Sequence, residues 1–303
     1  MFDSLFLERG LSLEKLRVLI DVDEAGSIAR TTQGDATRSS QYSRQLGELS
    51  EFFGCELTHR QGRVLKLTDE GAELAELVRR FLQGLEDYRA ECKRERVVFK
   101  IAAGDSLIHW LVMPGLGKLL KKMSEVGFTT LNLTTDEITR RISDGRVDFG
   151  LIRKNALVDG MKCAPLGVLS YVAVVPVQLC SRKRAPTLSE VFSEFPMAMQ
   201  STNGQFTRQV RAIAVSKNAS FRPALACQSF PQAIAAVRSG QFAAIVPELS
   251  IQELPSGFVH KVEDSALREL QREIILAWNP RLMRIRSHAS KIGKELQTAL
   301  RLT

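Results

Sequence analysis

The sequence has few cysteines and no long apolar run, and both shortages exclude classes of protein. Its five cysteines are an odd number, include no CxxC pair and form no ligand spacing with the four histidines. We therefore expect reduced, mostly structural thiols and no metal site. A membrane-spanning helix needs roughly 18 consecutive apolar residues. The apolar stretch from Tyr171 to Val177 ends within seven residues, so no membrane partner is expected.

Signals for export and catalysis are also missing. The start of the chain has acidic residues and no cationic head, so we expect no secretory signal and a cytoplasmic location. HExxH, GxSxG, a GxGxxG after a strand and an EF-hand loop are absent. Residues 115–118 fail as a phosphate loop, because Val112 and Leu119 stand where glycine and Ser or Thr are needed. We predict no catalytic residues and no cofactor, with an enzyme on an α/β scaffold as the less favoured alternative.

The positive charge is distributed unevenly along the chain. The net charge is +8 and the isoelectric point is about 9.4, which usually raises nucleic acid or another polyanion as a partner. Residues 1–96, however, carry 15 basic and 18 acidic side chains, whereas residues 97–303 carry 27 basic and 16 acidic ones. The excess of +11 therefore lies in the C-terminal part. Whole-chain charge is a weak argument for DNA binding here, and the motifs must decide.

The first part of the chain has the pattern of a winged helix-turn-helix. Apolar residues recur at helical steps in the first segment, at Leu13, Leu16, Leu19 and Ile20. A second, short helix should open after Gly26 and Ser27, and a third should run from about Ser39 to Phe53. The alternation over 56–67, with a glycine turn at Gly62, predicts a two-stranded wing. We assign residues 1–67 to this domain.

Residues 68–96 are predicted to form one long helix. The sequence TDEG opens it, and an apolar stripe follows at Leu74, Leu77, Val78, Phe81, Leu82, Leu85 and Tyr88. Such a stripe needs a partner surface. Pairing of two copies would give a homodimer or homotetramer, and packing on the chain's own wing domain is the alternative.

Strands alternate with helices from residue 97 to the end, so we expect an α/β effector-binding domain over 97–303. Strands are predicted at 97–103, 128–134 and 147–152, and the alternation resumes from 166 to 247 before a strand at 273–278 and a C-terminal helix from about 284. This pattern predicts subdomain I at about 97–162 and 264–303 and subdomain II at about 163–263. Open α/β sheets place ligand sites at the carboxyl ends of their strands.

Six short segments together resemble one family, the LysR-type transcriptional regulators. They are LEKLRVLIDVDEAGS at 13–27, SRQL at 43–46, RQGR at 60–63, LTDEG at 67–71, DGRVDFGLI at 144–152 and AAVRSGQFAAIVP at 235–247. Each is weak alone, but their order and spacing over more than 230 residues are specific. The resemblance implies a winged helix-turn-helix, a dimerising linker helix and a two-subdomain effector domain like a periplasmic binding protein. It implies a ligand-responsive regulator whose partners are double-stranded DNA and a small-molecule effector.

The helix-turn-helix departs from the usual pattern of this family. Ungapped counting puts Asp35 where the turn usually has leucine, and Arg38, Ser39 and Ser40 where Ser-Gln-Pro usually opens the recognition helix. Threonines also replace usual residues at Thr31, Thr32 and Thr58. An aspartate in a core leucine position is costly unless it is exposed or hydrogen-bonded. The alternative function is therefore a degenerate member that acts through protein or ligand binding without specific DNA binding.

Candidate DNA-binding side chains lie in the third helix and the wing. A recognition helix meets the major groove with its N-terminal residues, and arginine forks suit phosphates. The candidates are Arg38, Ser39, Gln41, Tyr42 and Arg44 in the helix and Arg60 and Arg63 in the wing. An exposed polar face, an inward-packed Tyr42 and a solvated wing are the alternatives.

Candidate ligand-binding side chains lie at three strand-to-helix junctions of the α/β part. Helix N-termini present unpaired N–H groups, and a local excess of +11 favours an anionic or carboxylate ligand. Plain helix capping explains each junction equally well, while the family resemblance implies inducer binding between the subdomains at corresponding turns. The candidates are Asp105, Ser106, Thr134, Thr135, Ser201, Thr202 and Asn203.

Overall fold

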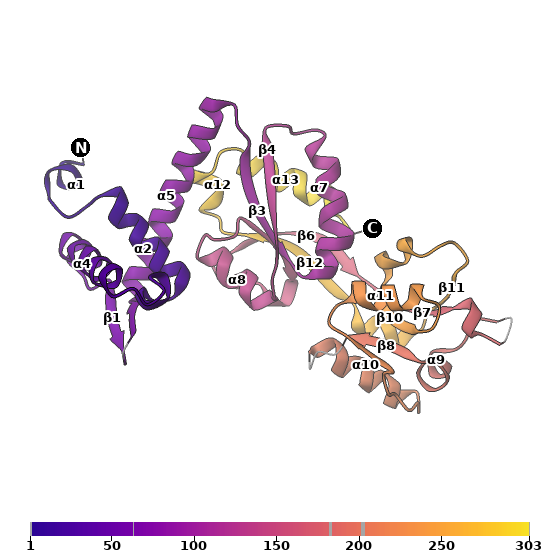
Figure 1. Ribbon diagram of the computed structural model, residues 1–303. Helices are drawn as coiled ribbons and strands as arrows, with labels where there is room; N and C mark the ends of the chain where they lie inside the picture. The colour runs from indigo at the N-terminus through magenta and orange to yellow at the C-terminus, as the bar shows by residue number, and fades with distance from the viewer. Residues whose placement is uncertain (1, 63, 182–183, 201–203, 303) are drawn as a thin grey trace. The chain divides into compact units, whose positions relative to one another are not determined.

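The computed structural model describes residues 2–62, 64–181, 184–200 and 204–302 (Figure 1). It divides into two compact units. The first unit contains residues 1–95 and the short segment 284–287, and the second contains residues 96–283 and 288–303. Each unit has its own hydrophobic core.

The first unit is a winged helix-turn-helix followed by a long helix, as predicted. Its elements are α1 (Asp3–Leu7), α2 (Leu13–Ala25), α3 (Ile28–Thr31), α4 (Ala36–Phe53), β1 (Thr58–Gln61), β2 (Val64–Leu67) and α5 (Asp69–Lys93). Short polar side chains begin the helices by accepting a backbone N–H bond from the first turn, at Ser12, Ser27, Asp35 and Thr68. The wing strands pair antiparallel across Gly62, whose φ of 65° suits the turn.

The core of the first unit lies between α2, α4 and the first turns of α5. Leu19, Leu46 and Leu49 are fully buried there, and Ala75 and Val78 of α5 pack against them. Gly71 sits where α5 passes the carbonyl group of Leu57, and a Cβ atom there would clash with that oxygen. This close approach explains the glycine of the TDEG segment.

The second unit contains two mixed sheets. The order β4-β3-β5-β12-β6 forms the first sheet and β11-β7-β10-β8-β9 the second. Strand bounds are β3 (Val97–Ala103), β4 (Val126–Asn132), β5 (Phe149–Arg153), β6 (Lys162–Leu169), β7 (Tyr171–Pro176), β8 (Met197–Gln200), β9 (Leu225–Cys227), β10 (Ala243–Pro247), β11 (Val259–Val262) and β12 (Arg272–Trp278). Helix bounds are α6 (Asp105–Leu107), α7 (Met113–Leu120), α8 (Thr135–Ser143), α9 (Leu188–Glu194), α10 (Gln205–Ser216), α11 (Phe230–Arg238), α12 (Leu282–Ile285) and α13 (Ala289–Ala299).

Helices cover both faces of each sheet of this unit (Figure 1). In the first sheet, Ile138 and Ile142 of α8 pack on one face, and α13 brings Gly293 against Phe149 on the other. In the second sheet, α9 and α10 pack on one face and α11 on the opposite face. Each sheet therefore forms its own α/β subdomain, with apolar cores on both of its faces.

The crossings between the sheets lie slightly beyond the subdomain limits expected at residues 163 and 264. Because β6 pairs with β12, the chain stays in the first sheet until Leu169 and enters the second at Tyr171. It returns at β12, after Leu267 and Leu270 have packed into the core of the second sheet. The boundary follows strand pairing, which alternation of apolar residues does not reveal.

The C-terminal helix expected from about Arg284 is interrupted. The short α12 ends at Ile285, and α13 begins after His288, which has a left-handed φ of 62°. Residues 284–287 between them group with the first unit. Within this segment, the buried Arg286 forms an ion pair with Asp87 of α5.

Candidate functional site

Asp35 caps the third helix of the helix-turn-helix. Its Oδ1 atom accepts a hydrogen bond from the backbone N–H of Arg38 at 3.0 Å, and the side chain is exposed. Helix α4 therefore begins at Ala36 rather than near Ser39. A carboxylate at a helix N-terminus is stabilised by the free N–H groups there. The cost of placing an aspartate in a core leucine position does not arise.

Helix α4 has a buried and an exposed face, and the DNA-binding candidates divide between them. Tyr42 is half-buried and packs against the core of the first unit. Ser39 is also half-buried, and its hydroxyl lies 2.6 Å from Oγ1 of Thr32. Exposed polar side chains occupy the other face, at Thr37, Arg38, Ser40, Gln41 and Arg44.

Thr37 and Ser40 are exposed positions that the sequence analysis missed. Counting back from the buried Leu46 by four and seven residues leads to Tyr42 and Ser39, which identifies the inward face. The signal was therefore present in the helical period. Thr37 was missed because the helix was started near Ser39, which left out its first turn. Ser40 lies inside the expected helix, and its exposed position follows from the same period.

The wing presents polar side chains on its first strand. His59, Arg60 and Gln61 of β1 are exposed, while the residues of β2 are half-buried. Arg60 pairs in register with Leu65 across the hairpin. Arg63 lies outside the described residues.

Helix α5 has two apolar faces, one packed against the wing domain and one exposed. Leu74, Val78 and Leu82 pack on the core of the chain's own wing domain. A second set is exposed, with fractional exposures of 61% for Leu77, 52% for Phe81, 48% for Leu85 and 67% for Tyr88. Packing on the wing domain accounts for the first set and leaves the second without a partner in the described chain.

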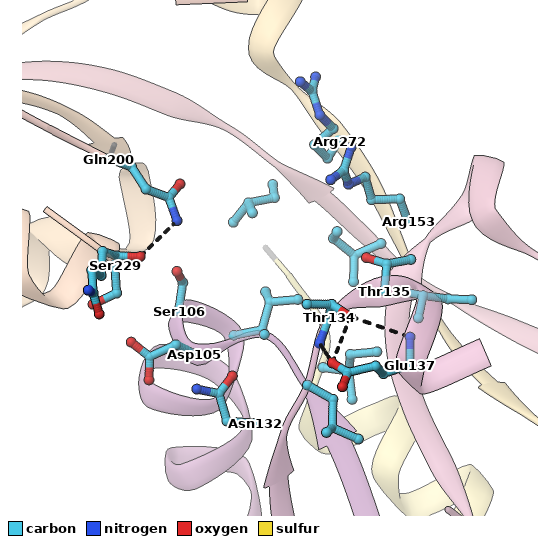
Figure 2. Close-up of a pocket in the computed structure, with 18 of the residues that line it drawn as sticks. Asp105, Ser106, Asn132, Thr134, Thr135, Glu137, Arg153, Gln200, Ser229 and Arg272 are labelled. Atoms are coloured by element: carbon cyan, nitrogen blue, oxygen red, sulfur yellow. Dashed lines mark hydrogen bonds between the residues drawn. The ribbon is translucent and has the colours of Figure 1, made fainter. Parts of the chain in front are cut away.

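A pocket of about 730 Å³ opens between the two sheets of the second unit (Figure 2). Four of the predicted ligand-binding residues line it: Asp105 and Ser106 after β3, and Thr134 and Thr135 after β4. The other three, Ser201, Thr202 and Asn203, lie outside the described residues. The pocket lies at the carboxyl ends of β3, β4 and β5, where an open α/β sheet is expected to bind a ligand.

The helix N-terminus at Thr134 is already occupied by an internal carboxylate. Oε2 of Glu137 accepts hydrogen bonds from the backbone N–H of Thr134 at 2.9 Å and from its hydroxyl at 2.7 Å. The backbone N–H of Glu137 in turn donates to the hydroxyl oxygen of Thr134, which completes a capping box. These bonds hold the pKa of Glu137 below its usual range. An anionic ligand would find few free hydrogen-bond donors at this turn. Ser106 and Thr135 have no comparable side-chain hydrogen bond among the described residues.

Arg153, Tyr171 and Arg272 are among the pocket residues that were not predicted from the sequence. Arg153 ends β5 and Arg272 begins β12, and Figure 2 shows both side chains on the side of the pocket away from Asp105 and Ser106. Tyr171 begins β7, and burial raises its pKa to about 12, so its phenol is neutral. The residue types alone did not indicate that Arg153 and Arg272 share a pocket. They come together because β12 pairs antiparallel with β5, which is far away in the sequence.

The described part of the chain offers neither a metal cluster nor a membrane-spanning helix. It holds no cluster of three or more His, Cys, Asp or Glu side chains that could bind a metal ion. None of its helices is both long enough and apolar enough to cross a bilayer. The five cysteines are free thiols.

Two family models match the chain. The model described as a bacterial regulatory helix-turn-helix protein of the lysR family matches residues 13–72, and the LysR substrate binding domain matches residues 93–288. The chain therefore belongs to the LysR family. Both matches agree with the fold and with the motifs found in the sequence.

Known relatives support the same fold. The transcriptional regulator CrgA of Neisseria meningitidis serogroup C is 39% identical over 142 residues, which cover 46% of each chain. The structure of ArgP from Mycobacterium tuberculosis has a TM-score of 0.66 at 18% identity and covers 96% of this chain and 97% of its own. Full-length CbnR complexed with its target DNA has a TM-score of 0.52 at 16% identity and covers 96% and 100%. The chain spans about half the length of the curated relatives it matches.

Proposed function

We propose that the protein is a LysR-type transcriptional regulator that binds double-stranded DNA and responds to a small molecule in the cleft of its second unit. The observation that carries the DNA-binding part is the exposed polar face of the capped helix α4. The side chains of Thr37, Gln41 and Arg44 recur at helical steps along this face. Donors and acceptors on such a helix can reach base edges and phosphates.

The wing supplies the remaining contacts of this proposal. Arg60 is exposed on β1, and Arg63 follows the wing turn in the sequence. Arginine forks match phosphate oxygens, so the wing adds affinity that does not depend on base sequence. The similarity to CbnR, which is described as bound to its target DNA, supports the same use of the fold.

The proposal includes a homodimer or homotetramer joined through α5. Leu77, Phe81 and Leu85 leave too much apolar surface in water for a stable monomer. Light scattering at micromolar concentration should give an oligomer, and the double variant Leu77→Ser, Phe81→Ser should shift it towards monomer. Leu157→Ser, which alters an exposed leucine of the second unit, is the control. A monomeric wild-type protein would contradict this part of the proposal.

Fluorescence anisotropy with the DNA upstream of the gene and with scrambled DNA tests the main function. We expect preference for the upstream DNA and an affinity that falls steeply with salt, because bound arginines release condensed counterions. Arg60→Ala should flatten the slope of log K against log salt by about 0.9 and weaken all sequences alike. Arg222→Ala, on an exposed residue of the second unit, should leave the slope unchanged.

The opposite outcome defines the alternative function. If the oligomer shows no preference for its upstream DNA, with or without candidate ligands, specific DNA binding fails. A family member that acts through protein or ligand binding would then take its place. The substitutions at Asp35, Arg38 and Ser40 were the motive for that alternative, and the capping role of Asp35 weakens the first of them.

A further inference from the structure

Two arginines lie on the same face of the first sheet and reach the same pocket. Arg153 is opposite Ile274 in the antiparallel pair of β5 and β12. Side chains two residues apart on a strand share a face, so Arg272 lies diagonally beside Arg153. Both residues line the pocket between the two sheets (Figure 2).

Neither arginine has a counter-charge among the described residues. Nη1 of Arg153 donates to Oε1 of Gln205 at 2.7 Å. Arg272 donates to the backbone oxygens of Glu269 and Gln271 and to Oε1 of Gln209. All of these acceptors are neutral. Burial lowers the pKa of Arg272, and the nearby charge of Arg153 lowers it further.

Two of the carboxylates near the pair are engaged elsewhere, and the third, Asp105, lies on the opposite side of the pocket (Figure 2). Glu273, which follows Arg272, binds Nζ of Lys154 at 2.7 Å. Glu137 is held by the backbone and hydroxyl groups of Thr134. Two adjacent cations in a partly buried position are unfavourable without an anion. The pair is therefore arranged for a negative group that the described residues do not supply on this side of the pocket.

We propose that the pocket binds an organic carboxylate whose carboxylate group is held by Arg153 and Arg272. This inference rests on the proposed function, because it names the chemical class of the effector. Guanidinium groups bind carboxylates through paired N–H bonds, and each arginine keeps N–H groups beyond those used for the glutamines. The neutral phenol of Tyr171 lines the same pocket and is a further donor.

The apolar part of the pocket favours an anion that carries an organic body. Apolar side chains contribute to its lining, at Leu107, Leu133, Leu151, Ile152, Leu169 and Ile274. An inorganic phosphate or sulfate would leave this apolar surface uncovered, whereas an aliphatic or aromatic acid covers it. Polar groups at the far side, including Ser106 and Asn132, would bind other substituents of the acid.

The arginine pair also connects ligand binding with the contact between the two sheets. Gln205 and Gln209 stand one turn apart on α10, which packs on the second sheet, while both arginines belong to strands of the first sheet. A carboxylate bound by the arginines lies beside these bridging bonds. Its binding should stabilise the arrangement of the two sheets seen in the structure.

Isothermal titration calorimetry on the full-length protein tests the proposal with matched pairs of probes. Benzoate and succinate are compared with benzamide and succinamide at millimolar concentrations, because the amides keep the shape and lose the charge. We expect at least one acid to bind, and its amide to bind about 10- to 100-fold more weakly. Arg153→Gln and Arg272→Gln should each weaken the binding of the acid by a similar factor. Arg222→Gln removes a charge outside the pocket and should have no effect.

Thermal unfolding of the ligand-free protein at low salt adds a readout that needs no ligand. Arg153→Gln should keep or raise the melting temperature, because it removes a charge that faces Arg272 and no carboxylate. A structural ion pair would give a lower melting temperature. This measurement also shows whether each variant is folded before its ligand binding is compared.

Three results would overturn the proposal: no binding by either acid, equal binding of acid and amide, or unchanged acid binding in both arginine variants. Upstream DNA binding is measured on the same preparations without ligand. DNA binding with any of the three results would reject the arginine site and leave the proposed function standing. Charge-dependent acid binding without DNA binding would support the arginine site and reject the proposed DNA-binding function.

Discussion

Two arginine sites, one in each unit of the molecule, are arranged in opposite ways. In the first unit, Arg286 is buried and binds Asp87 of α5 through two bonds, from Nε to Oδ2 at 2.7 Å and from Nη2 to Oδ1 at 2.9 Å. In the second unit, Arg153 and Arg272 meet neutral oxygens. A buried, paired arginine is fixed in place by its partner. An arginine pair without a carboxylate leaves its charge available for a ligand.

The same contrast explains why net charge was a poor guide to function. The unit with the exposed α4 face has an acidic balance over residues 1–96, and the positive excess lies in the α/β part. Two of its arginines, Arg153 and Arg272, line the pocket. The basic isoelectric point therefore reflects the α/β part and says little about the helix-turn-helix.

The largest expected effect tests the paired arginine. Asp87→Asn should destabilise the protein by about 3–5 kcal/mol, because the buried guanidinium of Arg286 would lose the negative charge of Asp87. The urea midpoint of unfolding measures this loss. Glu86→Gln, on an exposed neighbour in the same helix, should change stability by less than about 0.5 kcal/mol. Equal midpoints for the two variants would contradict a structural role for the ion pair.

The next effect concerns the exposed face of α4. Gln41→Ala and Thr37→Ala should each cost about 1–3 kcal/mol of affinity on the preferred DNA and little on random DNA if these side chains contact base edges. Anisotropy with both DNAs measures the difference. Ser39→Ala is the comparison on the inward face, where the hydroxyl bonds to Thr32, and it should leave base discrimination intact. Loss of discrimination in Ser39→Ala alone would reverse the assignment of faces.

A smaller effect is expected at the start of α4. Asp35→Ala should cost about 0.5–2 kcal/mol of stability by removing the cap, whereas Asp35→Asn should retain most of it. Chemical denaturation of the wild type and of these two variants gives the order of their stabilities. If Asp35 instead occupied a core leucine position, Asp35→Leu would stabilise the protein. Such a gain would argue against the capping role.

The smallest effect tests a surface ion pair of the second unit. Arg184 bonds to Glu190 at 2.9 Å, and with the cap of α9 it lowers the pKa of Glu190 from 4.5 to about 2. A lowered carboxyl pKa gives stability that is present above pH 4.5 and is lost as the pH falls towards 2. The melting temperature of Glu190→Gln should therefore lie below that of the wild type at neutral pH and match it near pH 2. Glu194→Gln, on the same helix, is the control, and an equal pH dependence in both variants would contradict this role.

The sequence by itself determined the parts of the protein that depend on local pattern. Helical steps identified α2 and α5, alternation with a glycine turn identified the wing, and six short segments identified the family. It also indicated the turns at Ser106 and Thr134 that line the pocket. These features are set by neighbours within a few residues, and those neighbours are visible in one sequence.

Tertiary structure decided the roles of the charged side chains. Asp87 and Arg286 are 199 residues apart in sequence, and Arg153 meets Arg272 because β12 returns antiparallel beside β5. Whether an arginine is paired or free depends on strand register and on which segment packs beside it. Neither is encoded by the residues next to it in the chain, so the sequence could supply the arginines but not their partners.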